Sequence, residues 1–102
     1  MNKKEARLKL NVLLQLAALT QGWQDVNILK GKYRGTYQVL TRAAFTLAAC
    51  ELIGRDTEAL NLIARAIRRK RSNLYHYFKL AETSNYILLL SQKILKDYGK
   101  NK

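Results

Sequence analysis

The sequence predicts an all-α fold, a small single-domain helical bundle of four to five helices. Its 102 residues contain no proline, and Leu, Ala, Lys, Arg and Gln, all good helix formers, dominate. Apolar residues also recur at helical spacing along most of the chain. With 48% apolar residues, this length suits one hydrophobic core, so we expect a single domain over residues 1–102.

The first helix is expected at about residues 3–19. Its core stripe is predicted to consist of Leu8, Val12, Leu16 and Leu19, widened by Leu13 and Ala17. Residues 21–35 contain three glycines and should be irregular. Within them, Asp25 can cap a short helical turn at 26–29.

A second long helix is expected from Thr36 to Ile53, with Gly54 as its stop. Cys50 lies on the alanine-rich apolar face of this helix. Because it is the only cysteine, we interpret it as a small buried hydrophobe.

A third helix should begin after Asp56, whose carboxylate can accept hydrogen bonds from the first free amides. We expect it to continue without a break over 57–78, since its apolar residues keep helical spacing: Leu60, Ile63, Ile67, Leu74 and Phe78. A last helix over about 81–98 should stop at Gly99, and residues 100–102 should fray.

The charge balance points to a polyanionic partner. Nineteen Lys and Arg against seven Asp and Glu give a formal net charge of +12, and nucleic acid is the commonest partner of so basic a domain. We expect no membrane partner, because the longest uncharged stretch, residues 10–24, falls short of the roughly 20 apolar residues of a spanning helix. Glu5 and Gln15 interrupt a signal-like N-terminus. A lone cysteine excludes an internal disulfide, so a cytoplasmic location is expected.

No catalytic constellation stands out. The acidic residues are scattered, no phosphate-cradling glycine loop is present, and His76 lacks an evident partner. We therefore expect a protein that is not an enzyme and that has no cofactor, no metal and no small-molecule substrate.

The cations gather in two groups. Five lie within seven residues and have no acid among them to relieve their repulsion: Arg65, Arg68, Arg69, Lys70 and Arg71. The second group occupies the glycine-containing loop and the helix after it: Lys30, Lys32, Arg34 and Arg42. The alternative is a solvated charged face. We favour phosphate contact, and six such contacts predict a log–log salt slope of about −5.

Aromatic residues follow the arginine run, and aromatic faces beside cations suit stacking on unpaired bases. Tyr75 and Phe78 fit the predicted core stripe. His76 and Tyr77 point elsewhere on the continuous helix, so these two are predicted to contact nucleic acid.

Residues 63–66 and 74–78, with Gly54 upstream, resemble the helix-turn-helix of TetR-type repressors. The resemblance implies that the second helix enters the DNA major groove. It implies that DNA is read or clamped by Arg71, Ser72, Asn73, Tyr75 and His76. Where the family has a glycine followed by an apolar residue in its turn, this chain has Arg68 and Arg69, and Arg68 can adopt that turn only at a cost.

The overall layout carries a second resemblance. A Leu-rich first helix, a loop with residues 32–35 reading Lys-Tyr-Arg-Gly, and an alanine-rich second helix with an early Arg42 resemble the small helical subunit of type I CRISPR effector complexes. The resemblance implies a role in antiviral defence within a ribonucleoprotein complex. It also implies protein partners that include copies of itself, and a basic face that holds guide RNA with target, or the displaced DNA strand, without reading bases.

We favour this second resemblance, because a continuous helix over 57–78 keeps its apolar stripe unbroken. The helix-turn-helix DNA-binding regulator is the first alternative. A protein-interaction bundle, whose charge only keeps it soluble, is the second. The sequence leaves open whether the nucleic acid is RNA or DNA.

Overall fold

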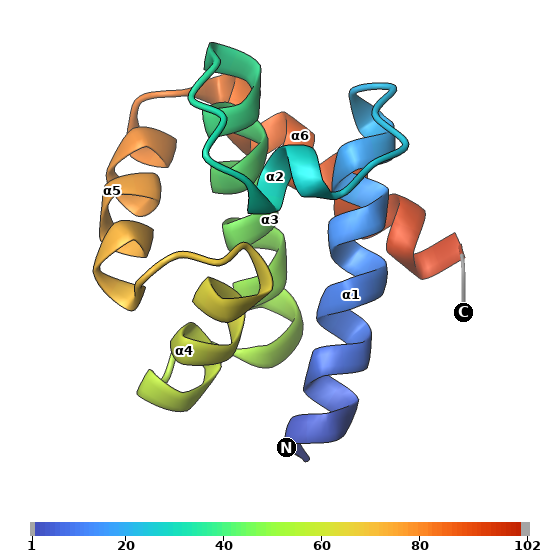
Figure 1. The fold of residues 1–102 in the computed structure, drawn as a ribbon, viewed down its shortest axis with the longest axis vertical. Helices are drawn as coiled ribbons and strands as arrows, with labels where there is room; N and C mark the ends of the chain where they lie inside the picture. The colour runs from blue at the N-terminus through green and yellow to red at the C-terminus, as the bar shows by residue number, and fades with distance from the viewer. Residues whose placement is uncertain (1, 101–102) are drawn as a thin grey trace.

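The computed structural model describes residues 2–100, which form six α-helices around one hydrophobic core (Figure 1). In chain order they are α1 (Lys3–Thr20), α2 (Asn27–Lys30), α3 (Thr36–Ile53), α4 (Thr57–Ala66), α5 (Arg71–Glu82) and α6 (Asn85–Lys100). The all-α class is confirmed. The expected four to five helices fall short because the predicted third helix is two separate helices.

Helix α3 is the central element. It packs against each of the other five helices, and its small residues allow the close approach: Ala43, Ala44, Ala48 and Ala49 are fully buried. The predicted bounds, Thr36 to Ile53, are confirmed, and Gly54 ends the helix at a φ of +98°, a conformation that favours glycine. Cys50 is buried as predicted, and burial raises the pKa of its thiol.

The predicted core stripe of α1 is wrong. Leu8, Val12 and Leu19 are 58%, 41% and 55% exposed. Leu13 and Ala17, predicted to widen the stripe, are buried as predicted, and they share the buried face with Ala6, Leu10, Leu14 and Ala18. Helix α1 therefore has two apolar faces, and α3 and α6 pack on the one with more alanines, where small side chains let helices come close.

The continuous helix expected over 57–78 is also wrong. Helix α4 begins at the predicted cap, where Asp56 Oδ1 accepts from the amide of Ala59 at 2.8 Å, but it ends at Ala66. Arg68 then takes a left-handed φ of +54°. The amide of Arg68 donates to the Arg65 carbonyl at 3.1 Å, and that of Arg69 to the Ala64 carbonyl at 2.8 Å. These two bonds form a Schellman motif, which satisfies the last carbonyls of α4.

The C-terminal part differs from prediction mainly in its bounds. Helix α5 continues to Glu82, and α6 begins at Asn85, where the Ser84 hydroxyl accepts from the amide of Ile87 at 3.3 Å. Helix α6 runs past Gly99 to Lys100. Of the tail expected to fray, residues 101 and 102 lie outside the described part of the chain. Within residues 2–100, no helix combines the length and apolar content needed to cross a membrane.

Candidate nucleic-acid interface

The structure brings the two predicted basic groups together. The central cations of the two groups lie in the α2–α3 loop (residues 31–35) and the α4–α5 turn (residues 67–70), which run close to each other beside α2 (Figure 1). Arg69 joins them: its Nη2 donates to the Gly31 carbonyl at 2.6 Å, and its Nη1 to the Lys30 carbonyl at 3.2 Å. Residues almost forty positions apart in the sequence therefore lie side by side. We call these two segments, residues 31–35 and 67–70, the basic junction.

One hollow at this junction is an open groove of about 680 Å³. Its cations are Lys32 from the loop and Arg68 from the turn, and both are exposed. Tyr33, 57% exposed, lies beside them. The groove thus places an aromatic ring next to two cations, the combination that suits unpaired nucleotides.

A second hollow, of about 360 Å³, lies between the α2–α3 loop, α3 and α5. We call it the arginine pocket. It is lined by Arg34, Val39, Arg42, Arg69, Asn73, His76 and Tyr77. Five of the predicted site residues therefore meet here, although they do not all face solvent.

Arg42 is not the surface cation that was expected. It is 1% exposed, and its Nε donates to the Leu29 carbonyl at 2.7 Å. Its Nη2 donates to the carbonyls of Ile28 and Gly31, each at 3.2 Å. Burial lowers the pKa of Arg42, and the nearby charge of Arg69 lowers it further, while Tyr77 raises it. The prediction that Arg42 contacts phosphate at the surface is wrong, because its guanidinium is occupied in fixing α2 against α3.

The two tyrosines of α5 are reversed relative to the prediction. Tyr77 is 6% exposed, whereas Tyr75 is 56% exposed. The reason is the break at residues 67–70: α5 starts afresh at Arg71, so its core face follows Leu74, Tyr77 and Ala81 rather than the stripe extrapolated from α4. His76 is exposed, as predicted for a contact residue.

The outward side of α5 is polar and basic. Its exposed residues are Arg71, Ser72, Asn73, Tyr75, His76 and Lys79, and the exposed Glu82 at the C-terminal end of the helix is its one acidic residue. The N-cap residue Lys70 makes no side-chain capping bond, and the first turn carries no acidic residue. Since the amides of a first helical turn favour an anion, this end of α5 adds to the positive character of the junction.

The other predicted cations are distributed around the same elements. Lys70 and Arg71 are exposed at the start of α5, and Lys30 is half-buried. Arg65 faces the other way and lines a groove of about 180 Å³ with Arg7 of α1. Arg7 was not predicted as a site residue, because its meeting with Arg65 depends on how α1 packs against α4. The visible signal was the run of cations near the N-terminus.

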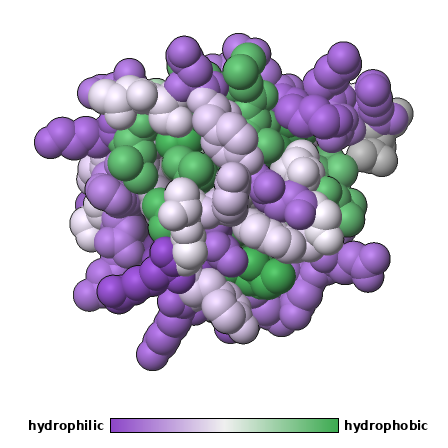
Figure 2. Space-filling view, turned by 90° about the horizontal axis from the view of Figure 1, so that it is seen from above, coloured by the Kyte–Doolittle hydropathy of each residue, from purple (hydrophilic) through white to green (hydrophobic). Residues whose placement is uncertain are grey.

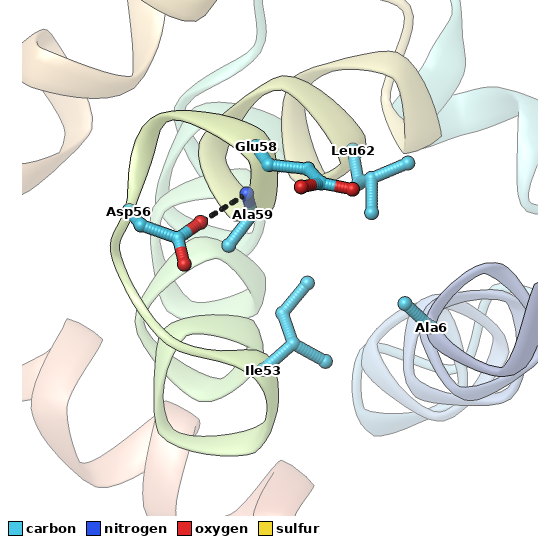
Figure 3. A pocket seen from close by; sticks show the side chains of 6 residues that line it. All are labelled: Ala6, Ile53, Asp56, Glu58, Ala59 and Leu62. Atoms are coloured by element: carbon cyan, nitrogen blue, oxygen red, sulfur yellow. Dashed lines mark hydrogen bonds between the residues drawn. The ribbon is translucent and has the colours of Figure 1, made fainter. Parts of the chain in front are cut away.

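The acidic residues at the start of α4 line a different and much smaller cavity, of about 50 Å³, beside α1 (Figure 3). Asp56 caps α4 there, and Glu58 lies 3.8 Å from the Lys3 ammonium. Both carboxylates are thus engaged in the start of the helix and its link to α1. Within residues 2–100, no three His, Cys, Asp or Glu side chains gather as metal ligands.

Fold and site together define an all-α protein in which a tight turn, residues 67–70, joins α4 to α5 beside a basic loop. Comparison with known proteins finds no matching family model, no matching curated protein and no matching solved structure. Its function is therefore inferred from its own residues.

Proposed function

We propose that the protein binds the phosphate backbone of nucleic acid, without catalysing a reaction, through the basic junction and the cations around it. The observation that carries this proposal is the lack of internal compensation. The ion pairs within residues 2–100 join Lys3 to Glu58 and Lys93 to Asp97. Among the residues that the structure describes, no carboxylate pairs with the cations of the junction, and a row of phosphates would relieve their repulsion.

The proposal places the protein as a small subunit of a ribonucleoprotein complex of the CRISPR-interference kind, where copies of the chain contact one another and other subunits. Its support is the layout described above, together with exposed apolar side chains. Leu8, Val12 and Leu19 form an uncovered stripe on α1. Figure 2 shows apolar groups among hydrophilic ones on the face of the molecule that it presents. Exposed apolar surface of this kind is typical of protein contacts.

A second candidate is a helix-turn-helix DNA-binding regulator, and the break at residues 67–70 favours it. In this mode α5 would lie in the major groove, with its outward side chains, such as Ser72 and His76, against base edges. Arg68, Lys70 and Arg71 would then contact the flanking phosphates. The two candidates share the same cations and differ in whether sequence is read.

Binding measured by fluorescence anisotropy over a salt series tests the proposal, with random single- and double-stranded oligonucleotides as probes. Five exposed cations are available on this surface: Lys32, Arg34, Arg68, Lys70 and Arg71. If all five meet phosphates of a duplex, the log–log slope is about −4.5, and a contact of Arg65 as well would bring it to the predicted value of about −5. No binding at low salt refutes the proposal and favours a protein-interaction bundle.

The matched variants keep the net charge equal. Replacing Lys32, Arg68 and Arg71 by Ala should reduce the steepness of the salt dependence by about 3 and weaken binding to every sequence alike. Replacing Lys4, Lys96 and Lys100 removes the same charge elsewhere and should change the slope by less than about 1. Arg69 is left in place because its guanidinium joins the turn to the loop. Equal losses in the two triple variants contradict the proposed surface. Tight binding to one sequence only favours the regulator.

A further inference from the structure

The arginine pocket holds more positive charge than the protein neutralises. Arg42 and Arg69 direct their guanidinium groups at the carbonyl oxygens that end α2, those of Ile28, Leu29, Lys30 and Gly31. Arg34 adds a third cation to the lining. Carbonyl dipoles at a helix end amount to roughly half a charge, whereas the three guanidiniums carry three full charges.

The excess positive charge of the arginine pocket is unfavourable at Arg42, where it is buried. Arg42 is 1% exposed and has no carboxylate partner among the described residues. A buried cation without a counter-ion is unfavourable, and the pKa of Arg42 is lowered first by its burial and then by the nearby charge of Arg69. An anion in the pocket would relieve both costs.

The lining also offers hydrogen-bond donors. Arg69 uses its two terminal nitrogens on carbonyls and makes no such bond through Nε, and Arg34 makes no side-chain hydrogen bond within the described part of the chain. Asn73 and His76 extend the lining from α5. Guanidinium groups are well suited to the oxygens of a phosphate.

We propose that the arginine pocket binds a phosphomonoester group. Its floor consists of buried residues, Arg42 and Tyr77, so it accepts a group attached through one bond better than a backbone phosphodiester, whose chain must leave on both sides. A phosphomonoester also brings a charge of about −1.5 to −2 at pH 7, against about −1 for a diester. Arg42 contributes its charge from beneath, and Arg34, Asn73 and His76 contribute at the mouth.

The phosphate can belong to the end of a nucleic-acid strand or to a free nucleotide. The first case rests on the proposed function, and the second does not. Three probes separate them: a random oligonucleotide with a 5′-phosphate, the same strand with a 5′-hydroxyl, and adenosine monophosphate with adenosine as its control.

For a strand end, we expect the 5′-phosphorylated oligonucleotide to bind on the order of tenfold more tightly than the 5′-hydroxyl strand. Arg34→Ala should abolish this difference. The matched control is Lys32→Ala, which removes a cation of the same loop that lines the neighbouring groove and not the pocket; it should weaken both strands equally. For a free nucleotide, adenosine monophosphate should raise the melting temperature of wild type and not that of Arg34→Ala, with no effect of adenosine.

Arg34 is exposed, so its replacement leaves the fold intact, and Asn73→Ala provides a second variant from α5. If the two strands bind equally and adenosine monophosphate has no effect, the proposal that the arginine pocket binds a phosphomonoester is refuted, even if the salt-dependent binding persists. A response to adenosine monophosphate without any oligonucleotide binding supports the pocket and refutes the proposed function. A loss of the 5′-phosphate preference in Lys32→Ala as large as in Arg34→Ala also overturns the pocket.

Discussion

Replacing Arg42 by Met should destabilise the protein, because the lost hydrogen bonds, worth about 2–4 kcal/mol, outweigh the gain from removing the repulsion between Arg42 and Arg69. Methionine keeps much of the side-chain length but donates no hydrogen bond. The Leu29 carbonyl would then lack its buried partner at 2.7 Å, at a cost of about 1–3 kcal/mol. The Ile28 carbonyl is partly buried and would add about 1 kcal/mol, while the Gly31 carbonyl keeps its bond from Arg69.

Urea denaturation followed by circular dichroism and by the fluorescence of Trp23 measures this change. Trp23 is the only tryptophan and packs against the core, so its emission reports tertiary structure while circular dichroism reports helix content. The hydrogen-bond loss alone corresponds to a drop in melting temperature of about 10–20 °C for a chain of this size, which is the upper limit of the expected effect.

The control is Arg34→Met, which removes an exposed arginine that makes no side-chain hydrogen bond in the described structure. Its free energy of unfolding should stay within about 0.5 kcal/mol of wild type. If Arg42→Met is equally harmless, the contacts with the α2 carbonyls do not stabilise the fold, and the structural role assigned to Arg42 is wrong.

Three further predictions concern Arg68, Cys50 and the two tyrosines of α5. Arg68→Gly should stabilise the protein by about 0.5–1 kcal/mol in thermal denaturation, because glycine adopts the left-handed φ of +54° without strain. A loss of stability would contradict the claim that the backbone of Arg68 is strained. Burial raises the pKa of the Cys50 thiol on folding, so the unfolded chain releases this proton first and the free energy of unfolding should fall as the pH rises above about 9. Cys50→Ala should lack that part of the pH dependence, and identical profiles would refute it. Tyr77→Ala should cost about 3–4 kcal/mol of stability. Tyr75→Ala should leave stability unchanged and weaken single-strand binding about tenfold; the reverse pattern would contradict the orientation of α5.

Local signals in the sequence predicted the elements whose limits depend on local chemistry. Both ends of α3 and the cap at Asp56 follow from the residues themselves, since a glycine stop and an accepting carboxylate act within one turn. The burial of Cys50 followed from the small residues around it on the same face.

The errors arose where contacts between distant segments decide the outcome. Helix α1 has two apolar faces, and nothing within it shows which one α3 and α6 cover. The left-handed conformation of Arg68 carries a cost of about 1–2 kcal/mol, and bonds from Arg69 to a loop almost forty residues away help to offset it. Arg42 was predicted to be a surface cation, because its neighbours in the sequence do not show that three carbonyls from residues 28–31 accept its hydrogen bonds.

The hydrogen bonds from Arg42 and Arg69 to backbone carbonyls make the shape of the basic junction independent of solution conditions near neutrality. Guanidinium groups stay charged there, and backbone carbonyls do not titrate. Buried or partly buried bonds are also screened much less by salt than exposed charges are. Salt that releases a bound strand should therefore leave the loop and the turn where they are, so that a salt titration reports dissociation of the ligand rather than rearrangement of the surface that holds it.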